Sequence, residues 1–138
     1  MSWKIIILLS FFGLIMAFLS VFWIPTKTEP IIWLVIFIFC GYIIAKYSPG
    51  RFFLHGFLIC ILNSIWITVI HFIFYDTYII NHPEILQINN SMPLKDSPRL
   101  LLLIIGPLIG TFSGIILGLI ATVAGKFVKR SADDYGTI

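Results

Sequence analysis

The sequence predicts an all-α integral membrane protein: a four-helix bundle with short loops and one longer extracytoplasmic loop. Three observations predict this fold class. Hydrophobic residues make up 59% of the 138 residues and charged residues only 11%, whereas a soluble domain carries roughly 25% charged residues. Four apolar stretches approach or exceed the length that crosses about 30 Å of hydrocarbon at about 1.5 Å per helical residue. The short connections between them contain proline and glycine, which end helices.

We expect one transmembrane domain over residues 1–138, with lipid as its surroundings. The expected spans are residues 5–24, 31–47, 51–75 and 100–126, and a polar tail follows at 127–138. Lys4 before the first span also suits the basic start of a signal peptide. However, a signal-peptide core has roughly 7–15 apolar residues, and the run after Lys4 has 20. Prolines bound the first connection, Pro25 to Pro30, and Ser48-Pro49-Gly50 makes a tight turn after the second span.

The longest polar stretch, residues 76–98, joins the third and fourth spans. Pro83 followed by Glu84 is typical of a helix start, because proline fits the first helical turn and an acidic side chain interacts favourably with the helix dipole there. We therefore expect a helix of one or two turns after His82, lying at the membrane surface.

Basic residues predict the orientation of the spans. Six of the nine lie on the side of both termini and the Ser48-Pro49-Gly50 turn, namely Lys4, Lys46, Arg51, Lys126, Lys129 and Arg130. The remaining three, on the opposite side, are Lys27, Lys95 and Arg99. Because cytoplasmic loops carry an excess of Lys and Arg, we expect both termini to be cytoplasmic.

Small residues predict how the spans pack. The fourth span carries a glycine ladder with a constant four-residue spacing: Gly106, Gly110, Gly114 and Gly118. Each step drifts by about 40° around the helix, so the ladder traces a diagonal stripe on which another helix can approach backbone to backbone. Its expected partner is the polar face of the third span; a second copy of the chain or another membrane protein is the alternative. Gly41 and Gly56 are expected to allow a close crossing of the second and third spans near their hairpin.

The third span carries a polar stripe, which consists of Asn63, Ser64, Thr68, His71 and Tyr75. These residues fall within about 140° of one helical face. Polar side chains at membrane depth seek partners inside the bundle. The stripe therefore either bonds to neighbouring helices or lines a path for a solute or a lipid head group.

Several kinds of chemistry lack the residues they need. No Asp or Glu lies inside an expected span, which disfavours a proton-coupled transporter. The scattered basic residues exclude a nucleic-acid-binding surface. No Ser-His-Asp set or phosphate-binding glycine loop is present, so we expect neither an enzyme nor a cofactor. Four residues near the end of the third span are of metal-ligating types: His71, Asp76, His82 and Glu84. Their spacings match no metal-binding motif, so no metal site is expected.

The C-terminal half has a recognisable order of features. Phe72–Tyr78 reads F-x-F-Y-D-x-Y, His82-Pro83 follows, and the glycine-laddered span ends in Lys and Arg. This order resembles that of small four-span bacterial membrane proteins of unknown function. The resemblance implies a bacterial cytoplasmic membrane and brings no activity. Two function classes stay open: a non-enzymatic protein with a packing, accessory or assembly role, and a transporter of small solutes or lipids that uses the polar stripe.

Overall fold

A computed structural model describes residues 1–93 and 96–129. The described residues form six α-helices and no strand: α1 (Trp3–Phe22), α2 (Glu29–Tyr47), α3 (Phe52–Ile73), α4 (Tyr75–Asn81), α5 (Pro83–Asn90) and α6 (Pro98–Phe127). Four of them, α1, α2, α3 and α6, are long and apolar enough to cross a membrane. The predicted all-α bundle of four membrane helices is confirmed. Most of the expected polar tail, residues 130–138, lies outside the described residues.

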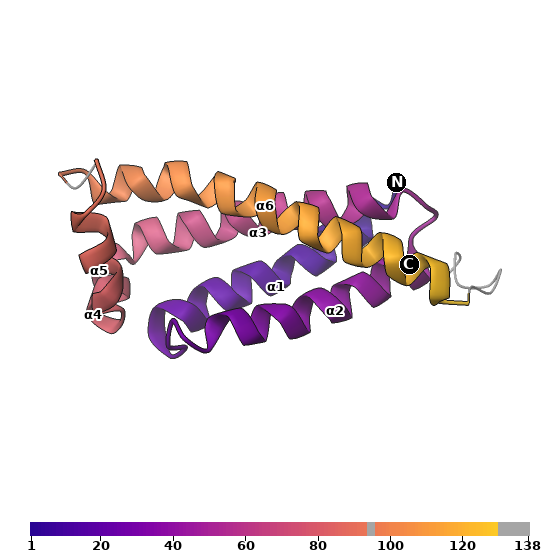
Figure 1. Ribbon diagram of the computed structural model, residues 1–138, viewed down its shortest axis with the longest axis horizontal. Coiled ribbons are helices and arrows are strands. Elements are labelled where there is room, and N and C mark those ends of the chain that lie inside the picture. The colour runs from indigo at the N-terminus through magenta and orange to yellow at the C-terminus, as the bar shows by residue number, and fades with distance from the viewer. Residues whose placement is uncertain (94–95, 130–138) are drawn as a thin grey trace.

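The four long helices run side by side along the molecule, and α4 and α5 lie across one end (Figure 1). α3 packs most extensively on α6 and next on α1, whereas α2 packs mainly on α6. The expected approach of Gly41 to the third span is therefore wrong: a Cβ at Gly41 would lie 2.7 Å from Ile120 Cγ2 on α6. The physical reason is that the glycine ladder brings α6 against α3. If only the α2–α3 hairpin determined the packing, α2 would lie against that side of α3, but α6 lies there instead.

An apolar core fills the end of the bundle that is opposite α4 and α5. Ile44 of α2, Ile59 of α3 and Leu117 of α6 are fully buried in it. Because lipid is as apolar as these side chains, the core stabilises the bundle through close packing rather than through the hydrophobic effect.

A buried histidine fastens the chain at this same end. His55 is fully buried, and its Nε2 accepts a hydrogen bond from the Ser2 N–H at 3.0 Å. Because Nε2 is the acceptor, Nδ1 carries the proton and donates it to the Arg51 carbonyl at 3.0 Å. His55 thus ties the start of α1 to the start of α3.

The opposite end is more structured than the sequence indicated. The predicted short helix after His82 is confirmed as α5, but α4 was not expected. The third span was expected to continue to Tyr75; instead α3 ends at Ile73, and Phe74 leaves helical geometry with φ −99° and ψ 28°. This turn directs α4 across the end of the bundle, where Tyr75 and Tyr78 are buried.

Candidate ligand-binding cavity

The glycine ladder of α6 lies against α3 of the same chain. The residues of α3 that a Cβ would meet first, in order from Gly106 to Gly118, are Thr68, Ser64, Phe57 and Phe53. Gly56 completes the contact from α3, because a Cβ there would lie 2.7 Å from the backbone nitrogen of Gly118. The two helices therefore touch through their backbones, and the ladder is covered within one chain.

The polar stripe of α3 is divided among several neighbours. Ser64 and Thr68 oppose the glycine ladder, and the ring of His71 stacks on Tyr78 with centroids 4.2 Å apart. Asn63 packs on α1, where a Cβ at Gly13 would lie 2.5 Å from Asn63 Oδ1.

Tyr75 does not share this environment. Because the chain leaves α3 at Phe74, Tyr75 begins α4, and its hydroxyl accepts a hydrogen bond from Asn89 Nδ2 at 3.3 Å. Asn89 lines the cavity described next, whereas Tyr75 does not belong to its described lining. Tyr75 therefore follows the first alternative for the stripe, a bond to a neighbouring helix.

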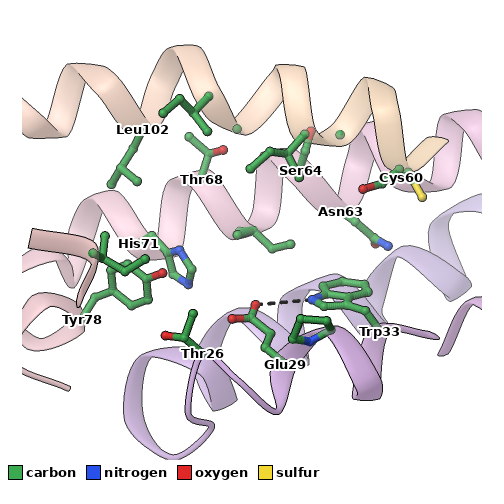
Figure 2. Close-up of a pocket in the computed structure, with 18 of the residues that line it drawn as sticks. Thr26, Glu29, Trp33, Cys60, Asn63, Ser64, Thr68, His71, Tyr78 and Leu102 are labelled. Atoms are coloured by element: carbon green, nitrogen blue, oxygen red, sulfur yellow. Dashed lines mark hydrogen bonds between the residues drawn. The ribbon is translucent and has the colours of Figure 1, made fainter. Parts of the chain in front are cut away.

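A cavity of about 680 Å³ lies between α2 and α6 (Figure 2). α3 forms its floor, and residues of α4 and α5 close it at one end. Four members of the polar stripe line it, namely Asn63, Ser64, Thr68 and His71. Most of its other lining residues are aliphatic or aromatic, including Phe37, Ile67 and Ile105.

The cavity opens sideways and has a closed inner end. On its rim, Leu34 of α2 and Ile109 of α6 are 56% and 59% exposed. In a membrane, a gap between two spans that is bordered by such side chains faces lipid. At the inner end, Phe37 and Cys60 belong both to the cavity lining and to the apolar core. The cavity is therefore a one-sided pocket that stops at the core.

A carboxylate lies at the end of the cavity that α4 and α5 close, which we call its outer end. Glu29 is in the first turn of α2, and its two oxygens accept hydrogen bonds from Ser20 Oγ at 3.2 Å and Trp33 Nε1 at 3.4 Å. Figure 2 places Glu29 near Thr26, His71 and Tyr78. Sequence reasoning missed this residue because it began the second span at residue 31. Pro30 was the available signal, since a proline in the first helical turn places the residue before it at the helix start.

Tyr78 supplies a hydroxyl to the same end of the cavity. Burial raises the pKa of Tyr78, and the nearby carboxylates of Glu29 and Glu84 raise it further. The phenol therefore keeps its proton at neutral pH. A protonated phenol can both donate and accept a hydrogen bond.

Three buried polar atoms of the polar stripe have no hydrogen-bond partner among the described residues: Asn63 Oδ1, Thr68 Oγ1 and His71 Nε2. A buried polar group without a partner costs about 1–3 kcal/mol. Asn63 Oδ1 faces a weak substitute for a hydrogen-bond donor, the Cα–H of Gly13. This C–H points where a Cβ would lie, and a Cβ there would be 2.5 Å from Oδ1. All three residues line the cavity.

No family model, curated protein or solved structure matches the chain. The chemistry of the cavity therefore has to come from its own residues. The four residues of metal-ligating types do not share one site: Asp76 Oδ2 accepts a hydrogen bond from Arg99 at 3.1 Å, whereas His82 Nδ1 lies 2.7 Å from Thr26 Oγ1 and 3.8 Å from Glu84 Oε1. Along the described ranges, no three such side chains are grouped around one point. What remains is an apolar pocket with a carboxylate and several hydrogen-bonding groups at one end.

The contact of Asn63 with Gly13 makes a testable prediction. Gly13→Ala is expected to destabilise the bundle by about 2 kcal/mol, because the new methyl group would overlap Asn63 and force α1 away from α3. In Asn63→Gly all three obstructing atoms are gone, including the Asn63 Cβ at 2.7 Å, so adding Gly13→Ala should cost much less. A double-mutant cycle measured by unfolding in mixed micelles should give a coupling of about 1 kcal/mol or more. Additive effects would contradict the contact.

Proposed function

We propose that the protein binds a lipid-like amphiphile, which enters the cavity sideways from the bilayer. The carrying observation is the combination of a lateral opening between α2 and α6 with a polar outer end at Glu29. A cavity of about 680 Å³ falls within the range of about 300–1,000 Å³ that is typical of ligand pockets. The apolar chain of the ligand would lie along α3, and its head group would lie beside Glu29.

The rim of the cavity favours a lipid over a water-soluble solute. A solute from water would have to pass aliphatic side chains such as Leu34 and Ile109, whereas a lipid tail already lies beside them. The core around Ile59 closes the inner end, which supports binding or one-sided loading rather than an open channel. This proposal belongs to the lipid-handling class that the sequence left open.

The accessory or assembly role has less support. That role needs a surface for a partner, and the glycine ladder was the motif that suggested one. The ladder faces α3 of the same chain, with Gly114 and Gly118 buried. The outward side chains of α6, such as Leu108 and Phe112, are apolar and suit contact with lipid tails equally well. We therefore propose binding without an enzymatic step as the function.

We also propose that the protein resides in a bacterial cytoplasmic membrane with both termini in the cytoplasm. The six-to-three distribution of basic residues supports this orientation. α4 and α5 would then lie on the outer side, and the cavity would load from the outer leaflet.

Filling the cavity tests the proposed function. Ile105→Trp is expected to lower bound lipid about tenfold, because a larger ring from α6 would occupy the space for the ligand chain. Ile104→Trp is the matched control, since its neighbour Ile104 points outward and is 52% exposed. Native mass spectrometry of the purified protein with extracted bacterial lipids gives the readout. Equal lipid occupancy in the two variants would contradict a ligand in this cavity.

A further inference from the structure

We propose that the cavity selects an amphiphile with a cationic head group, an ammonium, held by the carboxylate of Glu29 and the ring of Trp33. This inference rests on the proposed function, because it names the ligand class of the same cavity. Three observations carry it: the charge of the lining, the free acceptor capacity of Glu29, and the aromatic ring beside it.

The lining of the cavity carries a single formal charge. Glu29 is the one Asp, Glu, Lys or Arg side chain among the described residues that line it. Two basic groups outside the lining interact with other acids: Lys27 interacts electrostatically with Glu84, and Arg99 pairs with Asp76. An anionic head group would therefore meet an uncompensated carboxylate, whereas a cationic head group would neutralise it. The apolar surroundings strengthen both effects, since charges interact more strongly at low dielectric.

Glu29 retains acceptor capacity for a ligand. An ionised carboxylate offers about four acceptor sites. Only the Ser20 and Trp33 donors occupy them among the described hydrogen bonds, and both distances exceed 3.1 Å. Neither ion pair of the described residues includes Glu29. A charged donor from a ligand can therefore bind at a shorter distance than either neighbour does.

The aromatic side chains around Glu29 suit an ammonium group. Cations bind over the faces of Trp, Tyr and Phe rings, and Trp is the strongest of these. Trp33 lines the cavity beside Glu29, and its bond to that carboxylate fixes the indole (Figure 2). Phe37 packs edge-on against Trp33 with centroids 5.8 Å apart, which restrains the ring further. Tyr78 lines the opposite part of the same end, but His71 and His82 pack against its ring with centroids 4.2 Å and 4.6 Å away, so Trp33 offers the ring face for the cation.

Glu29 also has a structural contact, since Ser20 Oγ joins it to the end of α1. Glu29→Gln preserves the size of the side chain and one acceptor oxygen while removing the charge. A purely structural role would change the affinity for every ligand equally. A role in recognition would change the affinity for cations alone, so the comparison of ligands decides between the two roles.

The test uses three tritiated probes with the same hexadecyl chain: hexadecylammonium, whose head group has three N–H donors, hexadecanol and hexadecyl phosphate. Equilibrium binding is measured on the full chain in dodecyl maltoside. The wild-type protein is expected to bind the ammonium most tightly and the phosphate most weakly. Glu29→Gln should weaken ammonium binding about ten- to a hundredfold and leave hexadecanol binding unchanged. Glu84→Gln is the matched control, because Glu84 is an exposed carboxylate near the cavity that does not line it.

Three results would overturn the proposal of a cationic ligand while leaving the proposed lipid site intact. One is tighter binding of the phosphate than of the ammonium. A second is an equal loss for all three probes in Glu29→Gln, which is the structural outcome. The third is an equal loss of ammonium binding in Glu84→Gln, which would indicate a general effect of surface charge. Failure of every probe to bind the wild-type protein would overturn the proposed function as well.

Discussion

Replacing Gly56 with alanine is expected to destabilise the bundle by about 3 kcal/mol, because the new methyl group would overlap backbone atoms, which cannot move aside as a side chain can. A Cβ at Gly56 would lie 2.7 Å from Gly118 N and 2.8 Å from the Leu117 carbonyl carbon. Both atoms are backbone, so α3 and α6 must separate to admit the methyl group. Gly56→Leu should prevent assembly altogether. The measurement is the fraction of folded protein against denaturing detergent, followed by gel filtration.

Gly125→Ala is the matched control for this prediction. A Cβ at Gly125 would also lie 2.7 Å from its nearest atom, but that atom is Cε2 of the Phe52 side chain rather than backbone, so the two helices need not separate. Alanine is favoured over glycine within a helix by about 1 kcal/mol. The control should therefore be neutral or slightly stabilising. If Gly56→Ala were as stable as Gly125→Ala, α3 and α6 would not be in backbone contact.

The packing of the helices could be predicted in part from the glycine ladder. A constant four-residue spacing identifies the face of α6 that permits close approach, and that face lies against α3. The spacing alone does not name the partner, because any helix with a compatible surface can approach a stripe of glycines. The polar stripe of the third span made α3 the expected partner, and two of its residues, Ser64 and Thr68, do meet the ladder. Gly41 illustrates this limit: its position in the hairpin indicated α3, but it meets Ile120 of α6. The identity of a partner depends on all four helices at once.

The cavity could not be predicted from the sequence, although four of its polar residues were. Helical periodicity places Asn63 and Thr68 on one face, but it does not indicate whether a neighbour covers that face. The carboxylate of Glu29 was not predicted as a cavity residue because helix boundaries are uncertain by one or two residues. The second span was expected to begin at residue 31, which left Glu29 in the preceding turn, whereas α2 begins at Glu29 itself. His82 escaped notice as a buried group for a different reason. Its burial depends on α4, which turns it toward residues more than 50 positions earlier in the chain.

Replacing His82 with alanine is expected to release α4 and α5 from the end of the bundle. His82 is almost fully buried, and its Nε2 lies 2.7 Å from the Ser20 carbonyl. A carbonyl only accepts, so Nε2 carries the proton, and Nδ1 accepts from the Thr26 hydroxyl at 2.7 Å. Alanine removes both bonds and leaves a hole, at a cost of about 3 kcal/mol. Hydrogen exchange of the α4 and α5 amides should accelerate about a hundredfold.

Two further variants define what His82 does at the cavity. Thr26→Val keeps the shape of its side chain but removes one of the two bonds, so it should cost about 1 kcal/mol. Ile80→Ala is the matched control within α4, because Ile80 is 78% exposed, and its exchange should match the wild type. Since α4 and α5 close the outer end of the cavity, His82→Ala should also weaken lipid binding while leaving the α3–α6 contact intact. Unchanged exchange in α4 and α5 would show that other contacts hold this end of the bundle.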